Sequence, residues 1–228
     1  MITAGLPMPL AVVIPTLNAA ATLMATLDAL NGDEHVVVAD GGSTDGTVGL
    51  ARQAGATVVM TPPGRGSQLA AGAALATEDW LLFLHADTRL GAGWRGAVER
   101  FIGEPANATR AGYFRLRFAS DRPEARRVER MAAWRAGALG LPYGDQGLLI
   151  ARCHYEGLGG YRSLPLMEDV DLARRIGRAR LCALPAEAVT SAVRYERDGW
   201  WLRPTRNLAC LSLYFAGVPP RVIRTLYG

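Results

Sequence analysis

Carboxylates stand at the ends of two strongly apolar segments. The segment HVVVAD ends in Asp40, and the segment WLLFLHAD ends in Asp87. A carboxylate in such a place can accept a hydrogen bond from a base N–H or a ribose hydroxyl, and we expect this role for Asp40. It can also hold Mg²⁺ or Mn²⁺ against diphosphate oxygens, because both ions prefer carboxylate and phosphate oxygen. We expect that role for Asp87, with His85 orienting the loop rather than binding the metal.

Two glycine-rich segments accompany these acids. Gly42 in DGGSTDGT leaves the backbone open to a ligand, although the segment is neither a GxGxxG motif nor a P-loop. In PPGRGSQLAAG, Arg65 precedes a helix that we expect to start at Ser67 or Gln68. Free amides at a helix start, together with one arginine, can cradle a phosphate or a pyrophosphate. Taken alone, each segment is equally compatible with a turn that binds no ligand.

The segment IPTLN follows the first apolar run of the chain. Pro15 should end the hydrogen-bonded ladder of a strand, and Asn18 should cap the helix that follows. These two residues would leave the backbone groups of Thr16 and Leu17 exposed to a ligand. A simple turn between a strand and a helix explains the same residues.

Further acids and amides occur in the second half of the chain. The segment MEDVDLARRI places Glu168 and Asp169 at the expected start of a helix, where acids favour the macrodipole and can pair with the arginines that follow. From the residues alone, that structural role is the simpler interpretation. The segment YGDQG is a polar loop that can approach a sugar, through Gly144, Asp145 and Gln146.

The elements that must position these groups follow from the hydrophobic pattern. Short β-rich runs, AVVIP, HVVVAD, TVVMT and WLLFLHAD, alternate with alanine-rich stretches of helical character. Strands that are apolar on both faces and joined by helical crossovers run parallel and are covered by helices on both sides. We therefore expect an α/β fold with a Rossmann-like, mostly parallel sheet. Ligands of such sheets lie beyond the carboxyl ends of the strands, where Asp40 and Asp87 stand.

The second half of the chain is less regular. A strand-like segment, AGYFRLRFA, leads into an arginine-rich helix that we expect over 123–139. The Met131, Trp134 and Leu139 side chains of this helix should pack on the core, with its arginines outside. Contact of the helix with acidic lipid or an anionic acceptor is the alternative. No repeat, low-complexity block or linker divides the sequence. We expect one domain, with a first half over about 10–105, a second half over about 106–200 and a C-terminal helical segment over 200–228.

The composition indicates a globular chain of 228 residues, of which 50% are hydrophobic and 20% are charged. The net charge of +4 comes without a single basic tract, so we expect no nucleic-acid partner. A phosphate-bearing small molecule and an anionic membrane surface both fit that charge. Three cysteines without CxxC spacing, and a start without a basic n-region, predict a cytoplasmic protein without a secretory signal.

The C-terminal segment combines aromatic, apolar and basic residues. Trp200 and Trp201 precede an apolar stretch, 208–218, which is shorter than the ~20 residues of a spanning helix. Peripheral membrane contact, burial against the rest of the chain and a homodimer interface are all compatible with this pattern.

Taken in order, these segments resemble family 2 of the glycosyltransferases, which are inverting enzymes with the GT-A nucleotide-sugar-binding fold. The resemblance rests on VVIPTLN, VVVADGGSTDGT, GRGSQLAAGA, LLFLHADT and LPLMEDVDLARRI, and it extends from about Leu10 to Tyr214. The spacing is similar to that of a small bacterial branch whose strand tip reads HADT. The resemblance implies that the first half binds the nucleotide sugar and that the second half holds the acceptor and the catalytic base.

The activity that the resemblance implies is the metal-dependent, inverting transfer of a sugar from a nucleoside-diphosphate sugar, UDP-linked by family habit, to a hydroxyl acceptor. Asp169, beside Glu168, would take the proton of the acceptor hydroxyl, because an alcohol is a weak nucleophile at neutral pH. Asp87 would hold Mn²⁺ or Mg²⁺, and the loop of Gly144, Asp145 and Gln146 would border the sugar pockets. The residues implied in nucleotide binding are Pro15, Thr16, Asn18, Asp40, Gly42, Arg65 and Ala86.

Two departures from the family pattern leave alternatives open. Many relatives carry an acid where this chain has Ala19, and most carry one where it has His85. A nucleotide-sugar-binding protein without catalysis would tolerate both changes, although Asp87 and Asp169 are retained. A nucleotidyltransferase would also place acids at strand ends, but its glycine-rich basic motif is missing from the start of this sequence.

Overall fold

A computed structural model describes residues 9–30 and 34–227 of the chain. The expectation about a secretory signal concerns the start of the sequence, of which residues 1–8 lie outside the described residues. In chain order the elements are β1 (Leu10–Thr16), α1 (Ala20–Asp28), β2 (His35–Asp40), α2 (Thr47–Gln53), β3 (Thr57–Met60), α3 (Arg65–Leu75), β4 (Trp80–Phe83), β5 (Thr88–Leu90), α4 (Trp94–Ile102), η1 (Pro105–Thr109), β6 (Ala111–Phe118), α5 (Pro123–Leu139), η2 (Gly144–Gln146), β7 (Leu148–Ala151), α6 (Arg152–Gly157), α7 (Glu168–Ile176), η3 (Arg178–Arg180), β8 (Leu181–Thr190), α8 (Val193–Asp198), α9 (Leu202–Phe215) and α10 (Pro220–Tyr227).

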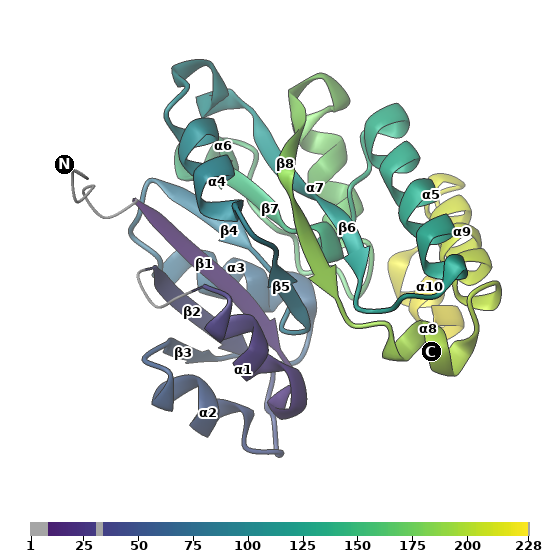
Figure 1. The fold of residues 1–228 in the computed structure, drawn as a ribbon, viewed down its shortest axis with the longest axis horizontal. Coiled ribbons are helices and arrows are strands. Elements are labelled where there is room, and N and C mark those ends of the chain that lie inside the picture. Colours follow the sequence, from purple (N-terminus) through teal and green to yellow (C-terminus); the bar gives the residue numbers. More distant parts are fainter. Residues whose placement is uncertain (1–8, 31–33, 228) are drawn as a thin grey trace.

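The described strands form one sheet in the order β3-β2-β1-β4-β7-β6-β8-β5. Strands β3, β2, β1 and β4 run parallel, as the apolar runs and helical crossovers predicted. The second half joins this parallel block through the antiparallel pair of β4 and β7, in which Phe83 lies opposite Leu148. The η2 turn just before β7 is therefore beside the carboxyl end of β4. Figure 1 shows the parallel block at one side and the C-terminal helices at the other.

Helices cover both faces of the sheet, as expected, because the side chains of a strand alternate between its two faces. On β1, Leu10, Val12 and Ile14 are fully buried in a cluster with side chains of α1, α2 and α4. Ala11 and Val13 point the other way, into a cluster with α3, α6 and α7. The sheet is therefore a middle layer that holds its strand tips in fixed positions.

The arginine-rich helix forms over the expected residues, but its packing face differs from the expectation. Helix α5 spans Pro123–Leu139 and packs on β6 through small side chains such as Ala125 and Ala132. Met131 and Trp134, expected in the core, are 52% and 64% exposed, and Leu139 is exposed as well. Small side chains let the helix approach the sheet closely, so the larger apolar side chains are left on the outside.

No helix in the described part of the chain is both long and apolar enough to cross a membrane.

Candidate active site

The tips of β1 and β2 are tied together by the Asp40 carboxylate. Its two oxygens accept hydrogen bonds from Thr16 Oγ1 (2.7 Å), the Gly42 and Ser43 amides (2.9 and 2.7 Å) and Ser43 Oγ (2.6 Å). Burial by itself would raise the pKa of Asp40, but these hydrogen bonds from Ser43, Thr16 and Gly42 outweigh it and lower the pKa. Asp40 is 0% exposed, so it shapes the loop in this structure, and its contact with a nucleoside stays a prediction.

Asn18 does not cap helix α1, contrary to expectation. Its backbone takes a positive φ of 51°, its amide donates to Ser43 Oγ, and its Oδ1 accepts from the Thr44 amide. The start of α1 is instead satisfied from the next loop, because Asp45 Oδ2 accepts from Ala20 N and Thr47 Oγ1 accepts from Ala19 N. The segments IPTLN and DGGSTDGT thus form one hydrogen-bonded rim beside the strand tips.

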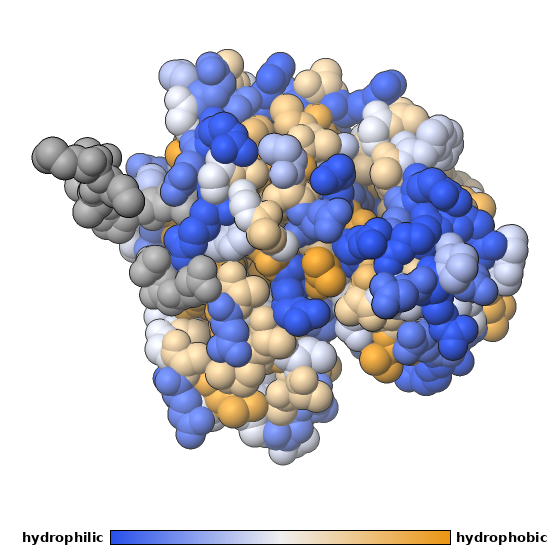
Figure 2. Space-filling model, in the orientation of Figure 1, coloured by the Kyte–Doolittle hydropathy of each residue, from blue (hydrophilic) through white to orange (hydrophobic). Residues whose placement is uncertain are grey.

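A cleft of about 550 Å³ lies beyond the tips of the parallel strands. Figure 2 shows the molecule hollowed between the lobe of α1 and α2 and the lobe of α8 and α9. Helix α3 starts at Arg65, two residues earlier than expected, and this start places Arg65 in the cleft wall. The Ala86 carbonyl accepts a hydrogen bond from Thr26 of α1. The expected site residues that line the cleft are Pro15, Thr16, Asn18, Arg65, Ala86 and Asp87.

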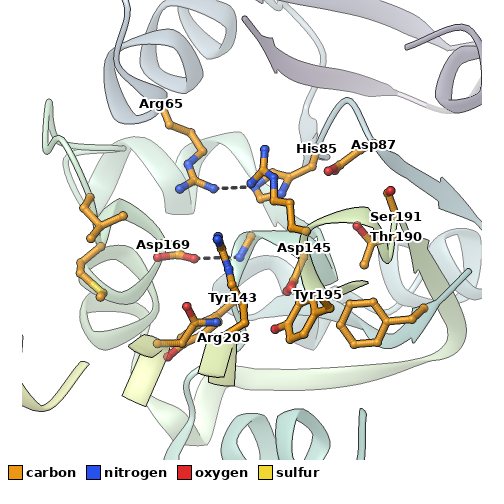
Figure 3. A pocket seen from close by; sticks show the side chains of 16 residues that line it. Arg65, His85, Asp87, Tyr143, Asp145, Asp169, Thr190, Ser191, Tyr195 and Arg203 are labelled. Carbon is orange, nitrogen blue, oxygen red and sulfur yellow. Dashed lines mark hydrogen bonds between the residues drawn. The ribbon is translucent and has the colours of Figure 1, made fainter. Parts of the chain in front are cut away.

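A second cavity, of about 100 Å³, adjoins the cleft. The two share five lining residues, which are Arg65, His85, Asp87, Ser191 and Arg194. Gly144, Asp145 and Asp169 line only the second cavity. Figure 3 shows Arg65, His85 and Asp87 across this cavity from Asp145 and Asp169. The acids expected in metal binding and in catalysis therefore face one space, although 82 positions separate Asp87 from Asp169 in the sequence.

Arg65 is held at the boundary of the two cavities. Its Nε atom lies 2.6 Å from Glu168 Oε1, and its Nη1 atom lies 3.4 Å from His85 Nε2. Glu168 is 1% exposed, and burial raises its pKa to about 7, with Arg65 opposing the rise and Asp169 adding to it. Glu168 is thus a buried partner of Arg65. It was expected to act beside the catalytic base, but in this structure its carboxylate orients the arginine.

Asp169, at the start of helix α7, is oriented by two backbone amides, one from the same helix and one from the η2 turn. Its Oδ1 accepts from the Val170 amide at 2.8 Å, and its Oδ2 accepts from the Gly144 amide at 2.9 Å. Met167, just before the helix, takes a positive φ of 66° and turns the chain into the helix here. Each carboxylate oxygen accepts one hydrogen bond from a backbone amide. Lone pairs therefore remain through which the carboxylate can accept a proton in the cavity.

His85 and Asp145 are both shifted toward their neutral forms. Burial, together with the positive charge of Arg65, lowers the pKa of His85 to about 4, so the ring is neutral at pH 7. Burial raises the pKa of Asp145 to about 6 despite the opposing charge of Arg135, and Asp145 Oδ1 is buried without a hydrogen-bond partner. Gly144 lies against the histidine, since a Cβ there would be 2.5 Å from His85 Nε2.

The donor groups around Asp87 fit a metal ion only in part. Within 9–30 and 34–227, no group of three or more histidine, cysteine or acidic side chains is arranged to hold a metal ion. Asp87 supplies one carboxylate to the shared wall of the cleft and the cavity. One or two carboxylates suffice for Mg²⁺ where substrate phosphates and waters complete its coordination. A metal ion at Asp87 would therefore need diphosphate and water oxygens to complete its coordination.

Gln146 of the YGDQG loop serves the fold in this structure. It is 1% exposed, its Nε2 donates to the Phe114 carbonyl at 3.1 Å, and its Oε1 accepts from Arg135 and from the Tyr143 amide. It pins the η2 turn under the cavity, while its neighbours Gly144 and Asp145 reach the lining. Direct contact of Gln146 with a sugar stays a prediction.

Sequence reasoning missed the groups that follow strand β8. The lining of the smaller cavity also includes Thr190, Ser191, Arg194, Tyr195, Arg203 and Asn207. The strand-end rule could have indicated the first two, but Pro185 and Glu187 interrupt the apolar pattern of β8 and hide it as a strand. Sequence reasoning also missed that Gln68 connects helix α3 to strands β1 and β2. Its Nε2 donates to the Thr16 and Ala39 carbonyls at 2.7 and 2.8 Å.

Part of the sequence is similar to curated glycosyltransferases. A PGL/p-HBAD biosynthesis glycosyltransferase of Mycobacterium bovis is 41% identical over 105 residues, which cover 41% of this chain and 41% of that protein. This chain thus spans less than half the length of the curated relatives that it matches.

Two solved structures have a similar fold. The mannosyltransferase PcManGT of Pyrobaculum calidifontis, solved with GDP-Man and Mn²⁺, has a TM-score of 0.64 at 19% identity and covers 98% of this chain and 71% of its own. Glucosyl-3-phosphoglycerate synthase of Mycobacterium tuberculosis, solved with Mn²⁺, UDP and glucosyl-3-phosphoglycerate, has a TM-score of 0.53 at 20% identity, over 80% of this chain and 70% of its own. The expected GT-A fold is confirmed. The family model for "Glycosyl transferase family 2" matches residues 11–143, more than half of the sequence, and the chain therefore belongs to that family.

Proposed function

We propose that this chain transfers a sugar, with inversion, from a nucleoside-diphosphate sugar to a hydroxyl acceptor. The observation that carries the proposal is that Asp87 and Asp169 line one cavity, which adjoins the cleft beyond the strand tips. In the proposal, the nucleotide occupies the larger cleft and the sugar lies at the boundary with the smaller cavity. The acceptor enters the smaller cavity from the side of Asp169.

The diphosphate would be bound by positive charge from both halves of the chain. Arg65, Arg194 and Arg224 line the donor cleft together with Asp87. Arginine is suited to phosphate because its planar guanidinium donates several hydrogen bonds and stays charged. A divalent ion held by Asp87 and the diphosphate would neutralise charge on the leaving group. Glu168 keeps Arg65 in the cleft wall, so we assign Glu168 a positioning role.

Asp169 would remove the proton from the acceptor hydroxyl as the hydroxyl attacks the anomeric carbon. The bond from the acceptor oxygen to that carbon forms while the bond from the carbon to the diphosphate breaks, which inverts the configuration. The Gly144 and Val170 amides hold the Asp169 carboxylate in place before the acceptor arrives. A positioned base of this kind contributes about 10²- to 10⁴-fold to the rate.

UDP is the nucleotide that the family resemblance implies. Of the two structural neighbours described above, one was solved with UDP and the other with GDP-Man, so both nucleotides belong in the test. The acceptor is defined in the proposal only as a hydroxyl.

The proposal is tested by separating donor binding from turnover. With Mn²⁺ present, Asp87→Ala should weaken binding of the nucleotide sugar at least about ten-fold, because the metal loses its protein carboxylate. Asp169→Asn should keep the dissociation constant within about two-fold and lower donor hydrolysis or transfer about 10²- to 10⁴-fold. Calorimetry measures the first quantity and product release measures the second.

Asp79→Asn is the matched control, because it removes one carboxylate at an exposed position. It should leave both binding and turnover unchanged. Turnover that is independent of metal and unaffected at Asp87 and Asp169 would contradict the proposal. Donor binding without any turnover in the unaltered chain would indicate a nucleotide-sugar-binding protein instead.

A further inference from the structure

Helix α9 has an outward face without a charged residue. We define the outer face of α9 as the exposed residues of the helix and of the two residues that flank it. These are Trp201, Leu202, Thr205, Leu208, Ala209, Ser212, Phe215 and Ala216. Trp201, Leu208 and Phe215 are 70%, 60% and 50% exposed. Their spacing of seven residues puts them along one line of the helix. Surface helices in water normally place charged and polar residues on the outside, so solvation alone does not explain this face.

The opposite side of α9 is fixed to the rest of the protein. Arg203 and Asn207 line the smaller cavity, and Cys210 and Leu211 are buried in a cluster with α7 and α10. The Arg203 guanidinium also lies 2.8 Å from Asp198. Because these contacts hold the helix from within, its outer face is a fixed and uncovered surface.

Exposed apolar side chains of α5 extend this surface. Arg127 of α5 lies 3.4 Å above the Trp201 ring and donates to the Trp200 carbonyl, so the start of α9 is next to α5. Met131 and Trp134 follow Arg127 by four and seven residues and therefore share its side of the helix. The two helices lie together at the C-terminal side of the molecule in Figure 1.

Arginines stand beside this apolar surface. Arg127 covers Trp201 at one end of α9, and Arg174 lies 5.0 Å from the Phe215 ring at the other end. Arg221 and Arg224 are exposed on α10. Of the four arginines from position 199 to position 228, Arg203 is buried on the inner side of α9 and Arg224 also lines the donor cleft. The same stretch contains no aspartate or glutamate. The surface therefore combines exposed aromatic and aliphatic groups with positive charge.

We propose that the outer face of α9, with Met131 and Trp134 of α5, docks on a membrane surface that contains anionic lipid. Tryptophan and arginine are suited to the headgroup region, where apolar groups enter the acyl boundary and cations meet lipid phosphates. A second copy of the chain fits this surface less well. In a two-fold symmetric pair the same patch meets itself, which would bring the arginines of both copies together.

Docking would also orient the active site. The inner side of α9 lines the cavity of Asp169, so a docked molecule holds that cavity one helix away from the lipid. This step rests on the proposed function and implies an acceptor hydroxyl carried by a membrane-borne molecule. The docking itself does not depend on catalysis and is tested without it.

The test is co-sedimentation of the full chain with vesicles. Phosphatidylcholine vesicles with about 30% phosphatidylglycerol should bind the chain, whereas pure phosphatidylcholine vesicles should bind it at least about ten-fold more weakly. Raising the salt to about 0.5 M should weaken binding to the anionic vesicles, because ions screen exposed charges. Arg221→Gln should lower the partition coefficient about five-fold, since one basic residue near the surface is lost.

Leu208→Glu with Phe215→Glu should lower the partition coefficient at least about ten-fold, because two apolar anchors become charged. The matched control is Met60→Glu with Leu75→Glu, which makes the same change at 54% and 45% exposed side chains of β3 and α3. The control should bind the vesicles like the unaltered chain. Both double variants should bind nucleotide in solution equally well, so a failed donor assay and a failed docking assay are distinguishable.

Equal vesicle binding by the two double variants would overturn the proposal. So would equal binding of the unaltered chain to neutral and anionic vesicles. The proposal would also be overturned if the unaltered chain did not bind vesicles but formed a dimer, and if Leu208→Glu with Phe215→Glu converted this dimer to a monomer. That result would identify the face as a contact between two copies.

Discussion

Neighbouring acids in this protein have different tasks because their environments differ. Asp169 accepts hydrogen bonds from two backbone amides and faces a cavity. Glu168, the preceding residue, is buried against Arg65. Asp171, one turn of the same helix away, pairs with Arg175 at 2.6 Å and with Arg162 at 3.1 Å. The structural role expected for such acids at a helix start is therefore observed for Asp171. The helix carries one acid for the cavity, one for Arg65 and one for the surrounding structure.

Asp145 should reveal its environment through the pH dependence of stability. Its pKa is raised from 3.8 to about 6, so its stabilising contribution is complete below about pH 4 and is lost as the pH rises through 6. Asp145→Asn removes this loss. The variant should gain about 3 kcal/mol over the unaltered chain above pH 6, and the gain should vanish near pH 4. Urea unfolding of the ligand-free proteins at several pH values measures the difference.

At the scale of elements, the close contact of α3 with the sheet depends on glycine. A Cβ on Gly72 would lie 2.4 Å from Val13 Cγ1 of β1, so the helix could not stay at its present distance. At the start of the same helix, a Cβ on Gly66 would lie 2.1 Å from the Arg162 carbonyl oxygen. This close approach lets Gln68 reach the carbonyls at the tips of β1 and β2. Packing of α3 therefore contributes to the shape of the donor cleft.

Gly72→Ala should destabilise the protein by about 1–3 kcal/mol, because an added methyl group overpacks the contact of α3 and β1. Gly137→Ala is the control, since Gly137 lies inside helix α5 and a Cβ there meets nothing within 4 Å. The control should stabilise the protein by up to about 1 kcal/mol, because alanine favours a helix more than glycine does. Thermal unfolding of both variants shows whether each change lowers or raises the stability of the protein. A stabilised Gly72→Ala variant would show that the helix can move away from the sheet at little cost.

At the scale of the whole molecule, the cleft and cavity are built from both halves of the chain. Arg65 and Asp87 come from the parallel block, whereas Ser191 and Arg194 follow β8 and Arg224 comes from α10. The antiparallel contact of β4 and β7 brings these segments together within one sheet. A ligand in the cleft contacts both halves and should therefore stabilise them together.

UDP with Mn²⁺ should raise the thermal stability of the whole chain, by about 2.7 kcal/mol at a ligand concentration of one hundred times the dissociation constant. UMP should give a smaller shift than UDP, because it lacks the second phosphate that the arginines and the metal would bind. Adding a chelator should reduce the difference between the two nucleotides. Thermal-shift measurements with UDP, UMP and GDP provide the comparison. Equal shifts with UDP and UMP would contradict a diphosphate site at Arg65, Arg194 and Asp87.

The sequence by itself determined the features that depend on local pattern. Alternating apolar runs and alanine-rich stretches predicted β1 to β4 and their crossovers, and the bounds of α5 were correct at both ends. The strand expected to end at Asp87 ends at Phe83, and Asp87 lies in the turn before β5. It still follows the carboxyl end of β4, because strand polarity and the βαβ rule need only the order of segments. The ordered motifs also identified the family.

Only the tertiary structure decided how the polar groups are used. It turned Asp40 inward to Thr16 and Ser43, and it buried Gln146 under the η2 turn. It also brought Arg194 and Asn207 to the cavity of Asp169, and it placed the alanine face of α5, not its large apolar face, against the sheet. These outcomes depend on contacts between segments far apart in the chain. Hydrophobic periodicity predicts which residues form an element, but the space between packed elements decides which side chains meet.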